Sequence, residues 1–177
     1  GLMLEGRMAD DFARAGRKGN PVFPVTEGLD REKLREPPEF EGHWDPHVWM
    51  DVELWSECVA HVAKELGALD AASSDDYVAR ADEFRKQLTE LDGYIKKVIA
   101  TIPKEQRFLV TAHDAFGYFA QAYGIEVKAI QGISTDSQAA IADINSLVDF
   151  IVENKVPAIF VESSVSQKNI EAVIEGC

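Results

Sequence analysis

Residues 108–130 read FLVTAHDAFGYFAQAYGIEVKAI, and this stretch decides the fold. Its first residues, Phe108 to Ala112, are strand-forming, and a helical pattern runs from Ala115 to Tyr123 until Gly124 ends it. A second strand is predicted from Ile125 to Ile130. A strand, a helix and another strand in this order are typical of a crossover unit, so the two strands are expected to pair in parallel.

The same alternation continues to the end of the sequence. The pattern predicts a helix at Ser137 to Glu153, a strand at Ala158 to Glu162 and a helix at Gln167 to Glu175. The first of these helices has one apolar face, formed by Ile141, Ile144, Val148, Ile151 and Val152. Residues 103–177 are therefore predicted to form an α/β unit with a parallel sheet in βαβαβα order.

Polar side chains that can bind ligands follow each predicted strand. His113 follows the first, Ser134-Thr135-Asp136 follows the second, and Glu162-Ser163-Ser164 follows the third. The carboxyl ends of parallel strands meet at one edge, where open α/β folds bind ligands. Imidazole nitrogen suits zinc and other late first-row ions, and carboxylate oxygen also suits manganese. The edge is thus a candidate site for a divalent transition metal, and calcium is disfavoured.

The first part of the chain is predicted to be rich in helices. Residues 1–42 are expected to be loops, with one short strand at Val22 to Val25, and a helix capped by Asp51 is expected to run to Leu66, where Gly67 stops it. A longer helix starts at Ser73-Ser74-Asp75-Asp76, and Pro103 closes it. This single unbroken helix, between a helix-rich first part and a strand-helix second part, is interpreted as a stiff connector. The alternative is a coiled-coil strand, but the apolar repeat is too short to argue for one. The expected domains are 1–72, a connecting helix at 73–102, and 103–177.

The composition narrows the classes of partner that this protein can bind. The net charge is −13, from 31 acidic and 18 basic residues, which repels nucleic acid and anionic membranes and attracts cations. The same charge also serves solubility alone in many proteins. Cys58 and Cys177 form no CxxC pair, so neither a cysteine zinc site nor a disulfide framework is supported, and Cys58 is expected to be a buried free thiol.

A second candidate ligand lies in the pentad Asp45-Pro46-His47-Val48-Trp49, where proline stiffens the turn before a helix. Taken alone, either His47 or His113 is more often a packed or capping histidine than a ligand. His43 lies four residues before His47, but Pro46 rules out one helical face, so His43 reads as an exposed neighbour. His61 is expected to be solvated.

The segments DPHVW, HDAFGYF, QGISTDSQAA and FVESSVSQKNIEAV occur in this order. With them the chain resembles the zinc and manganese solute-binding proteins of bacterial ABC transporters over nearly its whole length. The resemblance implies two lobes joined by a long rigid helix, the second lobe being an incomplete parallel sheet with crossover helices. It also implies that the metal ligands include His47 from the first lobe and His113 from the second. Relatives with glutamate in place of the second histidine tend to bind manganese or iron, so His113 favours zinc.

Two ligands of the family have no matching position here, because one precedes the start of this sequence and the other lies beyond Cys177. The opening GLMLEGRM resembles an internal segment of the family. The chain is therefore expected to be a fragment lacking both ends, which by itself binds metal weakly. Asp45 is expected to orient its turn and Asp114 to cap the following helix. Glu162 could face the cleft, but a strand-end role with a hydrogen bond to backbone is preferred.

The function that follows from the resemblance is a monomeric extracytoplasmic solute-binding protein. It captures zinc, or manganese, between its lobes and delivers the ion to an ABC permease with its ATPase. It is expected to be periplasmic or lipid-anchored on the outer face of the membrane, and to be neither an enzyme nor a nucleic-acid binder. One alternative is a zinc-dependent hydrolase, although HExxH is missing and only Glu162 could serve as its base. The other is an adhesin of the same family.

Overall fold

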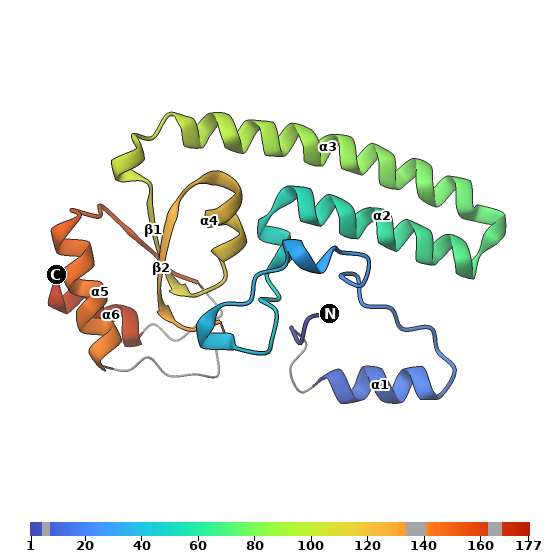
Figure 1. The fold of residues 1–177 in the computed structure, drawn as a ribbon, viewed down its shortest axis with the longest axis horizontal. Coiled ribbons are helices and arrows are strands. Elements are labelled where there is room, and N and C mark those ends of the chain that lie inside the picture. Colours follow the sequence, from blue (N-terminus) through green and yellow to red (C-terminus); the bar gives the residue numbers. More distant parts are fainter. Residues whose placement is uncertain (5–7, 134–140, 163–167) are drawn as a thin grey trace. The chain divides into compact units, whose positions relative to one another are not determined.

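The structure is a computed structural model that describes residues 1–4, 8–133, 141–162 and 168–177 (Figure 1). Its internal contacts divide the chain into two compact units, Gly1–Tyr94 and Ile95–Cys177. The division falls within the long helix α3, Ser74–Ala100. Each unit is built around its own elements.

The second unit contains the predicted alternation of strands and helices. Its strands are β1 (Phe108–His113), β2 (Glu126–Gln131) and β3 (Ile159–Phe160), and its α-helices after α3 are α4 (Gly117–Tyr123), α5 (Ile141–Glu153) and α6 (Lys168–Gly176). The strands pair in parallel in the order β2-β1-β3, which places β1 in the centre. The predicted α/β fold with a parallel sheet in βαβαβα order is confirmed.

The core of this unit lies between the sheet and two helices. Its buried members come from β1, β2, α5 and α6: Val110, Ala112, Ile130, Leu147, Ile151, Ile170 and Val173. The predicted apolar face of α5 is wrong at one position, because Val152 is exposed. Successive residues of a helix point about 100° apart, so Ile151 and Val152 do not both face the core.

Several element ends differ from the sequence prediction. β3 has two residues where five were expected, at Ala158 to Glu162. Helix α4 begins at Gly117, and its N-cap is Phe116, without a side-chain hydrogen bond. The prediction that Asp114 caps this helix is therefore wrong. The backbone N–H of Asp114 instead donates to the carbonyl of Gln131 at 3.0 Å, which extends the pairing of β1 with β2 and delays the helix. The predicted helix residues 137–140 and 167 lie outside the described residues.

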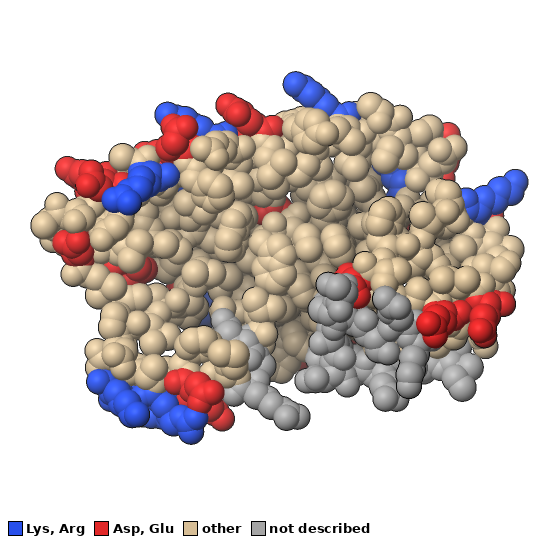
Figure 2. Space-filling view, turned by 180° about the vertical axis from the view of Figure 1, so that it is seen from behind, with Lys and Arg blue, Asp and Glu red and all other residues tan. Residues whose placement is uncertain are grey.

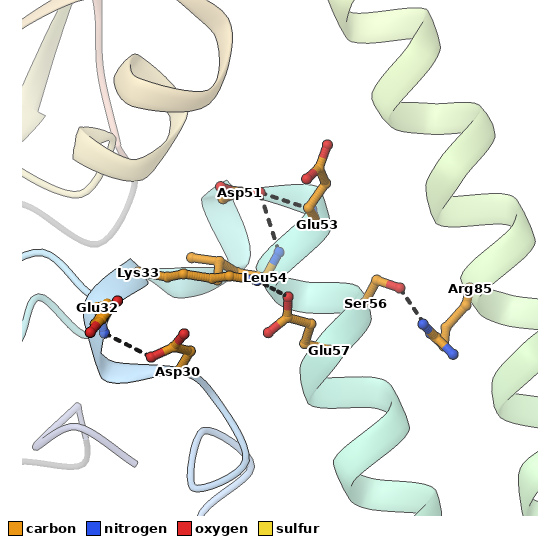
Figure 3. A network of polar contacts seen from close by, with 9 residues as sticks. All are labelled: Asp30, Glu32, Lys33, Asp51, Glu53, Leu54, Ser56, Glu57 and Arg85. Carbon is orange, nitrogen blue, oxygen red and sulfur yellow. Dashed lines mark hydrogen bonds and ion pairs between the residues drawn. The ribbon is translucent and has the colours of Figure 1, made fainter.

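The first unit is built on helices and short 3₁₀ turns. Helix α2, Val52–Leu69, starts at the predicted cap, where Oδ1 of Asp51 accepts from the backbone N–H groups of Glu53 at 2.8 Å and Leu54 at 3.3 Å (Figure 3). The helix continues through Gly67, contrary to prediction. A Cβ at Gly67 would lie 2.6 Å from Oγ of Ser74, so this glycine permits a close approach to the start of α3.

Residues 1–42 contain one helix that the sequence reading missed and lack the strand that it expected. Helix α1, Ala9–Arg17, has acidic residues in its first turn and basic residues in its last turn, and no residue of it is buried. Charge placement stabilises this helix, and its apolar residues Ala9, Phe12 and Ala13 fall at a helical spacing that the sequence reading passed over. Residues 22–25 form no strand. The 3₁₀ turns here are η2 (Arg31–Lys33), η3 (Pro38–Phe40), η4 (Val48–Met50) and η5 (Ala71–Ser73); η6 (Lys104–Gln106) belongs to the second unit.

Polar contacts tie these turns and helices together. Nζ of Lys33 lies 2.5 Å from Oε1 of Glu57 on α2, and Nε of Arg85 on α3 donates to Oγ of Ser56 at 3.1 Å (Figure 3). The hydrogen bond with Glu57 raises the pKa of Lys33. An exposed ion pair such as Lys33–Glu57 contributes little to the stability of the protein. Its main effect is to hold the turn at Lys33 against helix α2.

The surface carries both signs of charge despite the net charge of −13. On the face shown in Figure 2, acidic and basic side chains both occur, and neither sign forms one continuous patch. Among the described residues, no helix combines the length and apolar character needed to cross a bilayer.

Cys58 is a buried free thiol on α2, as predicted, whereas Cys177 is exposed. Burial raises the pKa of the Cys58 thiol to about 11. Since the thiolate is the reactive form, we expect native Cys58 to react with iodoacetamide at pH 8 at least about tenfold more slowly than Cys177. Mass spectrometry of timed samples measures both rates, and labelling in urea provides the control. Equal native rates would contradict the buried thiol.

Candidate metal centre

The first candidate ligand, His47, is held by the acidic residue two positions before it. Oδ1 of Asp45 accepts the backbone N–H of His47 at 3.0 Å and lies 2.8 Å from Nδ1 of its ring. Both side chains are buried, and the ring of Trp49 packs edge-on against the imidazole at 5.3 Å between centroids. Proline between the two residues limits the backbone of the turn. The prediction that Asp45 orients this turn is confirmed.

The carboxylate of Asp45 is itself held by an arginine that the sequence reading did not single out. Nη1 of Arg35 donates to Oδ2 of Asp45 at 2.9 Å, and the carbonyl of Arg35 accepts the backbone N–H of Asp45 at 2.8 Å. Ten residues separate the two in sequence. No periodicity connects them, so only the folded path of the loop brings them together.

The protonation of the imidazole follows from this contact. A carboxylate can only accept, so the His47 nitrogen that faces Asp45, Nδ1, carries the hydrogen. Nε2 is then the nitrogen with the lone pair. Histidine ligands of metals commonly have their other ring nitrogen held by a carboxylate in this way, which fixes the ring and raises its basicity. The geometry around His47 suits a metal ligand that binds through Nε2.

The second candidate ligand, His113, is the last residue of the central strand β1. Its backbone N–H donates to Oε1 of Glu162 at 3.2 Å. Its ring nitrogen Nδ1 lies 2.6 Å from Oε2 of the same carboxylate, an ion-pair distance without the alignment of a hydrogen bond. The predicted strand-end role of Glu162, bonded to backbone, is confirmed. A carboxylate thus lies beside Nδ1 of His113, as it does beside Nδ1 of His47, and Nε2 is the nitrogen that a metal ion could use.

The expected meeting of three strand ends is observed in part. The structure brings together His113 and Glu162, while Ser134-Thr135-Asp136 and Ser163-Ser164 lie outside the described residues. In the register of the sheet His113 pairs with Gln131, the last residue of β2. The buried Oε1 of Gln131 has no hydrogen-bond partner in the part of the chain that the structure describes. Its place at the end of the second strand was the sequence signal that could have identified it.

The remaining histidines, His43 and His61, both belong to the first unit. His43 is exposed as predicted, with its ring 5.2 Å from the ring of Phe40. The prediction that His61 is solvated is wrong: its side chain is largely buried, and its Nδ1 lies 3.8 Å from Oε1 of Glu65. A Cβ added at Gly28 would lie 2.9 Å from the His61 ring, so the loop at Gly28 covers it.

Each of the two units contains one candidate imidazole, His47 in the first and His113 in the second. Among residues 1–4, 8–133, 141–162 and 168–177, no three His, Cys, Asp or Glu side chains gather in a group that could hold a metal ion. The described residues therefore offer one candidate imidazole nitrogen in each unit, and a carboxylate lies beside each ring. Neutral nitrogen suits zinc and neighbouring late first-row ions.

The family model described as zinc-uptake complex component A, periplasmic (ZnuA) matches residues 1–177, which is the whole chain. The chain belongs to this family. Among ZnuA relatives, the zinc-binding protein TroA of Treponema pallidum is 43% identical over 173 residues, covering 98% of this chain and 55% of TroA. The manganese-binding lipoprotein MntA of Bacillus subtilis is 42% identical over 177 residues, covering 99% of this chain and 57% of MntA. The chain thus spans about half the length of these curated relatives.

Solved structures of ZnuA relatives have the same fold. The periplasmic zinc-binding protein TroA of Treponema pallidum matches with a TM-score of 0.93 and 41% identity, over 99% of this chain and 62% of that one. The laminin-binding protein Lmb of Streptococcus agalactiae matches with a TM-score of 0.78 and 30% identity, over 87% of this chain and 56% of its own. Lmb is described as a bifunctional protein with adhesin and metal-transporting activity.

Proposed function

We propose that this protein is the extracytoplasmic binding component of a divalent metal transporter and that His47 and His113 are two of its metal ligands. One observation carries the proposal: in both units, a carboxylate faces Nδ1 of the motif histidine, Asp45 for His47 and Glu162 for His113. This arrangement suits metal ligation through Nε2 in each case. Membership of the ZnuA family supports the same role.

Zinc is the favoured cargo. Two imidazole nitrogens suit zinc better than they suit manganese, which prefers oxygen ligands. The relatives named above are described as zinc-binding and manganese-binding, so manganese is the second candidate. Calcium, which takes oxygen ligands, does not fit two histidines.

The proposed partners are an ABC permease and its ATPase, which receive the ion from a monomeric binding protein. The location is the periplasm or the outer face of the membrane through a lipid anchor, in line with relatives described as periplasmic or as lipoproteins. We assign 1–72 to the first lobe, 73–102 to the connecting helix and 103–177 to the second lobe. The net charge of −13 favours cations and disfavours nucleic acid.

A binding role without catalysis is supported by the contacts of Glu162. A zinc hydrolase needs a general base beside the metal-bound water. Glu162 was the only candidate, and both of its carboxylate oxygens face His113, one at the backbone N–H and one at Nδ1. A carboxylate held in this way supports the ligand instead of activating water.

Calorimetric titration of the complete protein tests the proposal. We expect one zinc ion per chain, weaker binding of manganese, and no heat of binding with calcium. An ester substrate added to the zinc-loaded protein should not turn over. Metal-dependent ester hydrolysis would favour the hydrolase, and the absence of zinc and manganese binding would contradict the proposal.

A further inference from the structure

We infer that Arg35 is a positioning residue for the imidazole of His47 and that it acts through Asp45. The inference rests on the proposed function in one respect, since it takes His47 to be a metal ligand. The carboxylate of Asp45 contacts both the guanidinium of Arg35 and the ring of His47. Its effect is transmitted by the carboxylate that lies between them.

The two carboxylate oxygens of Asp45 face different partners. Oδ2 accepts from Nη1 of Arg35 at 2.9 Å, whereas Oδ1 faces Nδ1 and the backbone N–H of His47 at 2.8 and 3.0 Å. This division fixes the plane of the carboxylate. If Arg35 is removed, the carboxylate can turn about its Cβ–Cγ bond, and the contact with Nδ1 loses its geometry.

Charge makes the contact with Arg35 more than a local hydrogen bond. The side chain of Asp45 is 0% exposed, while that of Arg35 is 26% exposed. A buried carboxylate is costly unless it is paired and hydrogen-bonded. Nη1 of Arg35 places a positive charge beside Oδ2, and part of the Arg35 side chain is exposed to solvent. The ion pair orients the carboxylate so that its other oxygen, Oδ1, faces Nδ1 of the His47 ring.

The backbone adds a second connection. The carbonyl of Arg35 accepts the N–H of Asp45 at 2.8 Å, so the two residues are joined at main chain and side chain. This connection closes the loop between positions 35 and 45. Because a substitution at Arg35 keeps the main-chain bond, the side-chain effect can be measured in a folded protein.

The second candidate ligand is held differently. Glu162 is 23% exposed, and its recorded contacts are with the backbone N–H and Nδ1 of His113. In the described part of the chain, no Lys or Arg forms an ion pair with Glu162. Arg35 contacts the carboxylate that faces His47, so removing it is expected to affect His47 and to leave His113 unchanged.

Two-bond ¹H–¹⁵N correlation spectra of the metal-free complete protein test this inference, because they report which ring nitrogen carries the proton. We expect the His47 ring of the unmodified protein to carry its proton on Nδ1. Arg35→Met should move the nitrogen shifts of His47 toward a mixture of the two forms, and Arg35→Lys should restore part of the difference. Arg31→Met is the matched control, since Arg31 is an exposed arginine of the same segment.

Competition for zinc with a chromophoric chelator gives the second readout. Carboxylates in direct contact with a ligand histidine typically change affinity by about 10- to 100-fold, so one step further out we expect Arg35→Met to weaken binding by about 3- to 10-fold. Arg35→Lys should lie between Arg35→Met and the unmodified protein.

The outcomes separate this inference from the proposed function. Unchanged His47 shifts in folded Arg35→Met, or equal changes at His47 and His113, would overturn the positioning role. If Arg35→Met does not fold, Arg35→Lys decides, and unchanged His47 shifts in that variant would also overturn it. If His47→Ala keeps full zinc affinity, the ligand assignment fails, while the metal-free spectra still decide the role of Arg35.

Discussion

Replacing His47 or His113 with alanine is expected to lower the zinc affinity of the complete protein by more than about 100-fold. The reason is that each substitution removes a nitrogen ligand outright, whereas the loss of an outer-shell partner already costs about 10- to 100-fold. Alanine also leaves the facing carboxylate, Asp45 or Glu162, without its imidazole. Zinc competition titrations measure the affinity, with circular dichroism to verify the fold.

His43→Ala is the matched control for this experiment. His43 is exposed and lies four residues before His47. Its replacement should leave the zinc affinity within about twofold of the unmodified protein, because a lone exposed imidazole contributes little to a specific site. Full zinc affinity in both His47→Ala and His113→Ala would refute the ligand assignment. A loss in only one of them would restrict the site to that unit.

The fold of the second unit was predictable because its signals are local. The apolar run of β1 and the glycine at position 124, which adopts a left-handed conformation with φ of 67°, are visible in the sequence. The apolar spacing of α5 is equally direct. The boundaries were less predictable. Whether Asp114 caps a helix or extends a strand depends on the neighbouring strand β2, which accepts its N–H.

The first unit was less predictable, since its features depend on packing between segments. Helix α1 has a short apolar period, Ala9, Phe12 and Ala13, but it buries no residue. His61 lies on a side of α2 that looks polar in sequence, yet the loop at Gly28 covers it. When a distant segment covers a helix, the polar and apolar pattern of the helix sequence does not show it.

In the candidate site, too, the residues with local sequence signals were predictable and the one that depends on a longer-range contact was not. His47 and His113 stand in recognisable motifs, and Asp45 lies two residues from its partner, so local turn chemistry predicted its role. Glu162 could be placed because strand ends converge at one edge of a parallel sheet. Arg35 could not be placed, because its contact with Asp45 spans ten residues of irregular chain.

Asp45→Ala is expected to lower both the stability of the protein and its affinity for zinc. The substitution leaves the buried backbone N–H of His47 without its acceptor and removes the counter-charge of Arg35. A buried donor without a partner costs about 1–3 kcal/mol, so we expect the free energy of unfolding to fall by about 2–3 kcal/mol. The zinc affinity should fall by about 10- to 100-fold, because the ring of His47 is no longer oriented.

The control for stability is Asp30→Ala. Oδ1 of Asp30 accepts the backbone N–H of Glu32 at 3.0 Å, which is the same local bond that Asp45 makes to His47, but at an exposed position (Figure 3). Water can replace the exposed acceptor, so Asp30→Ala should cost no more than about 1 kcal/mol. Urea unfolding of the metal-free protein, followed by circular dichroism, gives both values. If both variants lose the same free energy of unfolding, the burial of Asp45 adds nothing to the cost of losing this hydrogen bond.

Asp45→Asn separates the hydrogen bond from the charge. An asparagine carbonyl can still accept the backbone N–H of His47, so this variant should lose less stability than Asp45→Ala. Its amide group has no negative charge to hold the Nδ1 proton or to pair with Arg35. The zinc affinity should therefore fall nearly as far as in Asp45→Ala. If Asp45→Asn binds zinc like the unmodified protein, the carboxylate acts on His47 only through the backbone turn, and its charge has no part in preparing the ligand.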